Sequence, residues 1–169
     1  MLGGLGVIIS ILQSAPAPRT RILVLCTGNS ARSQIAEGIL RFLDPQLEAF
    51  SAGTEPAAHI NPNAVRVMRE LGIDISGGKP KGVQQFLGES FDYVITVCDE
   101  AGKNCPNFSG KVGKRLHLGF VDPAAATGSE EVVLSVFRRV RDEIKIKFTD
   151  FYNQEIKQEP SASSAGKKR

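Results

Sequence analysis

Hydrophobic residues along the chain form short continuous runs that alternate with longer stretches of helical spacing. Residues 20–25 are apolar and rich in β-branched side chains, a pattern typical of a buried parallel strand. Between residues 33 and 43 the apolar positions recur three or four apart, and Pro45 follows them. This spacing predicts a helix that ends before the proline. Regular structure therefore begins with a strand, a short loop and a helix.

The same alternation continues along the chain. Asn61 followed by Pro62 is typical of a helix N-cap with proline at the first helical position. We expect strands at residues 47–52, 91–97 and 115–118, and helices at residues 61–71 and 129–148. This order predicts an α/β fold: a single-domain, three-layer α/β/α structure with a four-stranded parallel sheet.

Three residues with chemically active side chains stand just beyond predicted strands: Cys26, Cys98 and Asp122. Ligands of parallel α/β sheets bind beyond the carboxyl ends of the strands. The sequence therefore predicts that these three side chains converge on one site.

The two ends of the chain differ from this domain, which we place at residues 20–150. Residues 1–19 form an N-terminal extension of unknown role, and its apolar part is too short to span a bilayer and lacks a preceding Lys or Arg. An export signal is the alternative to a plain extension. Residues 151–169 end in a Ser-, Ala-, Gly- and Lys-rich segment, which predicts a disordered tail. We expect no membrane association.

Composition narrows the class of protein. A chain of 169 residues that is 41% hydrophobic can bury one core of ordinary size. The net charge is +3, and Lys167, Lys168 and Arg169 account for that surplus, so we expect no nucleic-acid partner. Three cysteines are too few, and odd in number, for a disulfide scaffold. We therefore expect a cytoplasmic protein with reduced thiols. We also expect it to be a monomer.

The loop from Cys26 to Ser33 places a thiol ahead of a guanidinium with five residues between them, directly before a helix. Backbone N–H groups of such a loop can line a nest, the helix N-terminus adds positive potential, and an arginine fork can close around a tetrahedral oxyanion. The same field favours the thiolate, which is the nucleophilic form. The predicted oxyanion-binding residues are Thr27, Gly28, Asn29, Ser30, Ala31, Arg32 and Ser33, and the Ser33 hydroxyl is placed to donate to the thiolate.

The sequence CTGNSARSQIAEG resembles the signature of the low-molecular-weight phosphotyrosine phosphatases. In that superfamily the cysteine attacks the central atom of the oxyanion, the arginine holds its oxygens, and an aspartate in an Asp-Pro pair protonates the leaving oxygen. The resemblance implies these roles for Cys26, Arg32 and Asp122, since Pro123 follows Asp122. An Asp-Pro pair alone is common in turns.

Two further cysteines bear on whether the chain is a reductase or a phosphatase, because only a reductase needs additional thiols, which carry the oxidation away as a disulfide. Cys98 and Cys105 flank the polar segment DEAGKN, and in a helix their Cα atoms would be roughly 10 Å apart, beyond the ~4.4–6.8 Å that a disulfide requires. The segment must therefore loop or unwind for the pair to close. A zinc site would need four ligands at paired spacings, which His59 and His117 do not show.

The run VCDEAGKNCP, followed by HLGFVDPAAATGSEE, is similar to thioredoxin-coupled arsenate reductases and extends the resemblance over most of residues 20–150. It implies that Cys26 attacks arsenate, that Cys98 then attacks Cys26 and releases arsenite, and that Cys105 attacks Cys98. Thioredoxin would reduce the resulting disulfide, and no organic cofactor is implied. Some members of the family bind potassium, which implies the ligands Asn29, Glu37 and Ser51.

Two other classes of function stay open at this point. A low-molecular-weight phosphatase would hydrolyse aryl phosphates through Cys26 alone, although Ala124, Ala125 and Ala126 follow Pro123 where such phosphatases usually carry a tyrosine. A non-catalytic oxyanion-binding or redox-sensing protein would keep the loop without needing Asp122.

Overall fold

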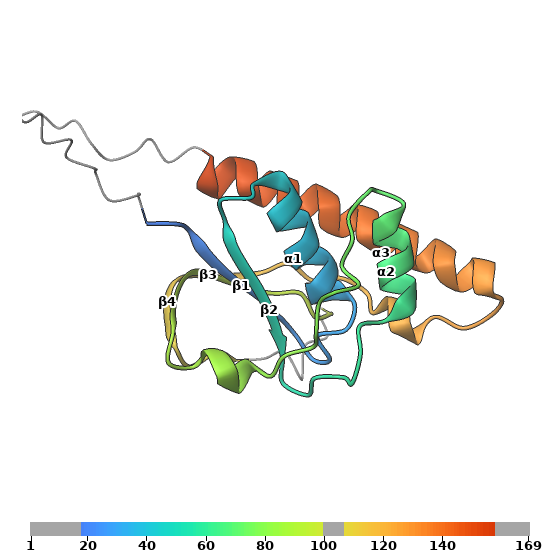
Figure 1. Cartoon of the computed structure of the whole chain (residues 1–169), viewed down its shortest axis with the longest axis horizontal. Helices are drawn as coiled ribbons and strands as arrows, with labels where there is room; N and C mark the ends of the chain where they lie inside the picture. Colours follow the sequence, from blue (N-terminus) through green and yellow to red (C-terminus); the bar gives the residue numbers. More distant parts are fainter. Residues whose placement is uncertain (1–17, 100–106, 158–169) are drawn as a thin grey trace, which may run out of the picture.

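A computed structural model describes residues 18–99 and 107–157 of the chain. Its centre is a parallel sheet of four strands in the order β2-β1-β3-β4 (Figure 1). The predicted α/β fold with a four-stranded parallel sheet is confirmed. The strands are β1 (Arg21–Cys26), β2 (Glu48–Gly53), β3 (Ser90–Thr96) and β4 (Lys111–His117).

The central position of β1 follows from its sequence. Its apolar run is covered on both faces, and Ile22, Leu23, Val24 and Leu25 have no exposed surface, as expected of a continuous hydrophobic strand. In register, Cys26 lies beside Gly53 of β2, and Leu25 lies beside Thr96 of β3. The carboxyl ends of these three strands therefore meet at one edge of the sheet.

Three α-helices cover one face of the sheet in Figure 1: α1 (Arg32–Leu43), α2 (Pro62–Arg69) and α3 (Glu130–Phe151). The predicted N-cap of α2 is present, since the Asn61 side chain accepts a hydrogen bond from the Asn63 N–H at 2.9 Å. Ser129 caps α3 in the same way through the Val132 N–H. These local signals fix where the helices begin.

The sheet separates two hydrophobic clusters. The larger lies under the α-helices and is centred on α1 and α3, with Ile35, Phe137 and Phe148 fully buried or nearly so. On the opposite face the short 3₁₀ helix η1 (Val83–Phe86) and Phe108 cover the strands. The three layers are thus unequal, because the second covering layer is a 3₁₀ helix with loops.

The C-terminal helix runs beyond its predicted end. The boundary with a disordered tail was expected at residue 151, but α3 continues to Phe151 and a π-helical turn, η3 (Tyr152–Ile156), follows. The physical reason is a late aromatic contact: Phe151 is buried and meets Tyr93 edge to face, with ring centroids 5.1 Å apart. The polar residues around it conceal this contact in the sequence. Residues 158–169 and the N-terminal extension through residue 17 lie outside the described residues.

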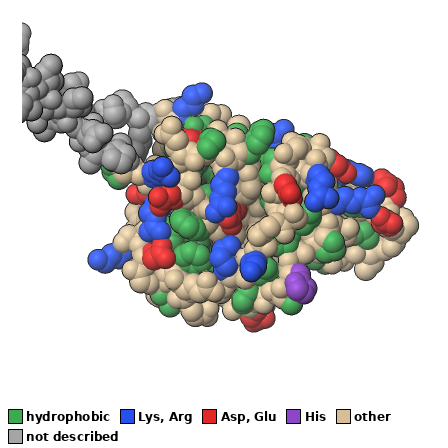
Figure 2. Space-filling model, viewed as in Figure 1, with side chains coloured by type: hydrophobic (Ala, Val, Ile, Leu, Met, Phe, Trp, Pro, Cys, Tyr) green, Lys and Arg blue, Asp and Glu red, His purple; other side chains and the backbone are tan. Residues whose placement is uncertain are grey.

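Many charged side chains on the surface form ion pairs with side chains of opposite charge. On the face shown in Figure 2, acidic side chains stand among the lysines and arginines, and pairs such as Lys114 with Glu155 at 2.7 Å are typical. None of the helices in the described part of the chain is both long and apolar enough to cross a membrane.

Glu70 connects the end of α2 to α3. Its carboxylate accepts hydrogen bonds from the Arg138 Nε at 3.1 Å and from the buried Arg141 at 2.8 Å. Arg141 also donates to the Val67 carbonyl at 2.8 Å. The hydrogen bonds from Arg138, and then those from Arg141, hold the pKa of Glu70 below its ordinary value.

We expect Glu70→Gln to lower the free energy of unfolding by about 0.5–1 kcal/mol at neutral pH, because the pair is partly exposed. A carboxyl group whose pKa is lower in the folded than in the unfolded chain stabilises the fold at pH values above its unfolded-state pKa. This stabilisation is lost as the pH falls through the folded-state pKa. The difference between variant and wild type should therefore shrink below about pH 4 in urea unfolding. Glu131→Gln is the control, since Glu131 is 77% exposed; a difference that persisted in acid would contradict the assignment.

Candidate active site at the end of strand β1

The predicted oxyanion loop joins β1 to α1. Cys26 is the last residue of the central strand and is 3% exposed, and Arg32 is the first residue of α1. The N-cap position, Ala31, makes no side-chain capping hydrogen bond. The N–H groups of the first helical turn therefore stay available to an oxyanion, which the helix dipole also favours.

Carbonyl groups of the loop are held on its outer side. The carbonyls of Thr27, Gly28 and Ser30 accept hydrogen bonds of 3.0, 2.9 and 2.8 Å from the N–H groups of Glu55, Ala57 and Asn61. All three donors belong to the segment between β2 and α2. With the carbonyls engaged outward, the loop N–H groups can line the concave side, as an anion nest requires.

The Cys26 sulfur is hydrogen-bonded within the loop. The Asn29 N–H lies 3.1 Å from it, and the Ser33 hydroxyl lies 2.9 Å from it. Hydrogen bonds donated to a sulfur stabilise its charged form. The predicted contact between Ser33 and Cys26 is therefore present in the structure.

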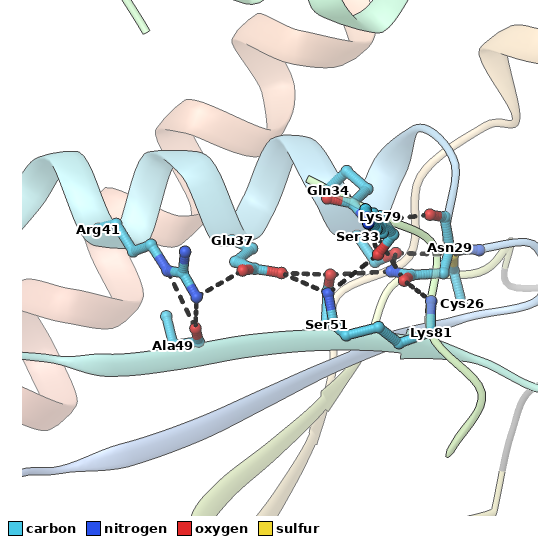
Figure 3. Close-up of polar contacts among 10 residues, drawn as sticks. All are labelled: Cys26, Asn29, Ser33, Gln34, Glu37, Arg41, Ala49, Ser51, Lys79 and Lys81. Carbon is cyan, nitrogen blue, oxygen red and sulfur yellow. Dashed lines mark hydrogen bonds and ion pairs between the residues drawn. The ribbon is translucent and has the colours of Figure 1, made fainter. Parts of the chain in front are cut away.

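Asn29 holds the loop in shape (Figure 3). It has a positive φ of 47°, a conformation that asparagine tolerates better than most residues. Its side-chain Nδ2 donates to Ser33 at 2.9 Å and to Ser51 at 2.8 Å. Its Oδ1 accepts from the Lys81 backbone N–H at 2.7 Å and from Gln34 at 3.2 Å. Since a backbone N–H can only donate, the orientation of the amide is fixed.

Arg32 links the loop to two acidic residues. It donates to the Phe120 carbonyl at 3.0 Å, its NH2 group lies 3.3 Å from the Asp122 carboxylate, and it forms an ion pair with Asp99. Asp122 caps the short helix η2 (Pro123–Ala125) by accepting from the Ala124 N–H at 3.1 Å. The structure therefore brings the predicted arginine and the predicted acid together, although they are far apart in the sequence.

Cys98 lies just beyond the neighbouring strand, near the end of β1. It follows β3 by two residues, and the Val97 N–H donates to the Leu25 carbonyl at 2.9 Å, which places Cys98 next to the end of β1. Cys98 is buried and disulfide-bonded, whereas Cys26 is a free thiol. Cys105 lies outside the described residues.

The three predicted potassium ligands also come together. Ser51 donates to the Glu37 carboxylate, and Asn29 donates to Ser51. Within residues 18–99 and 107–157, no three His, Cys, Asp or Glu side chains are grouped so that they could hold a metal ion. An alkali cation here would thus depend on the amide and hydroxyl oxygens beside Glu37.

Three residues of the site were not foreseen from the sequence: Gln34, Lys81 and Asp99. Gln34 donates to the Asn29 backbone carbonyl at 3.1 Å, Lys81 contributes its N–H to the same residue, and Asp99 pairs with Arg32. Asp99 stands beside Cys98 in the sequence, which is the one local signal that could have indicated it.

Comparison with known proteins assigns the chain to a family. Residues 21–162 match the family model described as low molecular weight phosphotyrosine protein phosphatase. The chain belongs to the low-molecular-weight phosphotyrosine protein phosphatase family. The matched residues include the whole loop from Cys26 to Ser33.

Several proteins to which the chain is similar are arsenate reductases. The chain is 46% identical over 131 residues to the arsenate reductase of Halalkalibacterium halodurans, covering 77% of this chain and 93% of that one. A solved arsenate reductase in a phosphate-binding state superimposes with a TM-score of 0.68 at 30% identity, covering 79% and 97% of the two chains. The thioredoxin-dependent arsenate reductase of Corynebacterium glutamicum gives a TM-score of 0.55 at 25% identity, covering 82% and 65%.

Gly53 allows the loop to approach β2. A Cβ atom at Gly53 would overlap the Thr27 carbonyl oxygen and would lie 3.0 Å from the Asn29 nitrogen. We expect Gly53→Ala to displace the loop, to weaken binding of inorganic phosphate and to destabilise the fold by about 1–3 kcal/mol. Calorimetric titration and urea unfolding measure the two effects. Gly77→Ala is the control, because a Cβ there meets nothing within 4 Å; unchanged phosphate affinity in Gly53→Ala would contradict the role of this contact.

Proposed function

We propose that this protein reduces arsenate to arsenite by a relay of three cysteines that thioredoxin recycles. The observation that carries the proposal is the Cys26 thiol, which accepts a hydrogen bond from the Asn29 N–H and is hydrogen-bonded to Ser33, at the base of a loop with outward-facing carbonyls. This arrangement provides a nucleophile and an oxyanion site in one place. The arsenate reductases among its relatives favour arsenate as the oxyanion.

The first step forms a covalent adduct. The Cys26 thiolate attacks arsenic, an arsenic–oxygen bond breaks, and Asp122 donates a proton to the leaving oxygen, which departs as water. Arg32 holds the remaining oxygens through its planar fork. In the structure Arg32 contacts Asp122 at 3.3 Å, so the acid and the oxyanion-binding cation are close enough to act on one substrate.

The second step transfers the electrons. Cys98 attacks the Cys26 sulfur, a sulfur–sulfur bond forms, and the sulfur–arsenic bond breaks with its electron pair left on arsenic. Arsenic(V) thereby becomes arsenic(III), and arsenite leaves. Support comes from the burial of Cys98 beside β1 and from its capacity to exist in a disulfide while Cys26 is free.

The third step frees Cys26 for another cycle. Cys105 attacks Cys98, and the resulting disulfide passes its oxidation to the dithiol of thioredoxin. The name of the Corynebacterium glutamicum neighbour supports this choice of reductant. A relay of this kind operates where the thiols stay reduced, and we therefore place the protein in the cytoplasm.

The decisive experiment follows NADPH oxidation with arsenate, thioredoxin and thioredoxin reductase. With the wild-type protein, thioredoxin reductase should oxidise NADPH only when arsenate is present. Cys98→Ala and Cys26→Ser should each abolish that oxidation, because each removes one thiol of the relay. Hydrolysis of an aryl phosphate, measured in parallel, reports the loop alone and should survive Cys98→Ala. Brisk hydrolysis by wild type without any arsenate-dependent oxidation would make the protein a phosphatase instead.

Asp122→Asn should slow the single-turnover formation of the arsenate adduct by roughly 100-fold or more, because the leaving oxygen loses its proton donor. Inorganic phosphate should still bind, since Arg32 and the loop are intact. Asp99→Asn is the matched comparison, because Asp99 is the other carboxylate on Arg32, and its effect should be much smaller. Equal effects of the two changes would assign both to the charge on the arginine.

A further inference from the structure

A chain of hydrogen bonds leads from Glu37 to the Cys26 sulfur (Figure 3). The Ser51 hydroxyl donates to Glu37, so Ser51 has lone pairs left to accept from the Asn29 Nδ2 at 2.8 Å. The second hydrogen of Nδ2 goes to Ser33 at 2.9 Å. Ser33 keeps its own hydrogen available, and it donates to the Cys26 sulfur when that sulfur is a thiolate, which can only accept. The Glu37 carboxylate, the Lys81 N–H on the Asn29 amide and the thiolate thus together give these hydrogen bonds one direction.

Two cationic side chains hold that carboxylate. The Lys81 ammonium lies 3.7 Å from Oε2 of Glu37, and the Arg41 guanidinium lies 2.7 Å from Oε1. Lys81 is itself held by the Lys79 carbonyl at 3.2 Å, and Arg41 donates to the Ala49 carbonyl at 2.8 Å. Both oxygens of Glu37, whose side chain is 10% exposed, thus face a fixed positive charge.

The donors beside Glu37 do not fit a potassium ion. Hard cations need free oxygen ligands, but the Asn29 Oδ1 already accepts two N–H groups, and the amide turns its Nδ2 toward Ser51. A cation beside Ser51 would meet an N–H donor there and the two cationic side chains at Glu37. Access is not the obstacle, since a cavity of 470 Å³ is lined by Glu37, Gln34 and Arg41.

We infer that the Lys81 ammonium takes the place of an alkali cation at this site and positions the Cys26 thiolate through Glu37, so that the reactivity of Cys26 is independent of potassium. Lys81 acts through other residues and touches no substrate. The inference rests on the proposed function only in taking Cys26 as the nucleophile, and it holds whichever oxyanion that nucleophile attacks.

The charges of the cluster support this role. Lys81 and Arg41 together outweigh the single negative charge of Glu37. Without Lys81, Glu37 would be held on one side only, by an arginine whose side chain is 56% exposed. The Glu37 carboxylate is itself almost fully covered, so water screens its charge weakly and the loss of Lys81 would be felt at Cys26. Lys81 is joined to the loop a second way, through its backbone N–H on Asn29, so its side chain is anchored close to the carboxylate.

The test measures alkylation of Cys26 by iodoacetamide across pH, read by mass spectrometry on the Cys26 peptide, together with the thermal unfolding midpoint. Full-length wild type is compared in equal concentrations of KCl and NaCl. Lys81→Met removes the charge, Lys81→Arg restores it, and Lys79→Met removes a neighbouring exposed lysine while keeping its backbone carbonyl. None of these readouts requires arsenate, so they separate this inference from the proposed function.

Wild type should give the same rate and the same unfolding midpoint in both salts. Lys81→Met should alkylate more slowly at neutral pH by roughly threefold to tenfold, as expected for loss of a nearby unit charge, with its pH profile moved upward. Lys81→Arg should recover most of the rate, and Lys79→Met should match wild type. A specific gain of wild type in KCl, or a wild-type pH profile in Lys81→Met, would overturn the inference. The salt comparison decides alone if Lys81→Met does not fold.

Discussion

The fixed orientation of the Asn29 amide is the constraint on which the oxyanion site depends. One backbone N–H, that of Lys81, determines which end of the amide accepts and which donates. The amide then directs Ser33 toward the sulfur on one side and joins Ser51 on the other. Because every donor and acceptor is used, rotating the amide would leave several buried polar groups unpaired, at a cost of about 1–3 kcal/mol each. The loop is therefore rigid before any ligand arrives.

Hydrophobic periodicity was enough to predict most of the fold. The strand at β1 and the helices α1 and α3 are recognisable because burial forces a regular apolar pattern on them. The prediction was weaker where burial is slight. Of β4 it found only the second half, because Lys111, Gly113 and Lys114 give the first half a polar appearance. Likewise, the isolated aromatic contact of Phe151 leaves no periodic signal, so α3 was predicted too short.

The site divides in the same way. Its loop residues are contiguous, so their types and spacing carry the chemistry in the sequence itself. Lys81 reaches Asn29 from 52 positions away, and Asp99 reaches Arg32 from 67 positions away. The Lys81 contact begins with a backbone N–H, which every residue except proline offers. A contact of this kind leaves no pattern of side chains in the sequence, so it can be identified only in the folded structure.

The polar character of β4 also affects how molecules meet. Among the strands that the structure describes, β4 ends the sheet in the order β2-β1-β3-β4, so its outer row of backbone groups has no partner strand there. Open edges of this kind are where copies of a protein can join into extended sheets. Two such edges placed together would bring Lys111 and Arg115 of one copy against the same residues of another, while Lys114 is already paired with Glu155. Like charges at that seam oppose edge-to-edge pairing, so Lys111, which weakens the strand signal in the sequence, also disfavours the joining of two sheets.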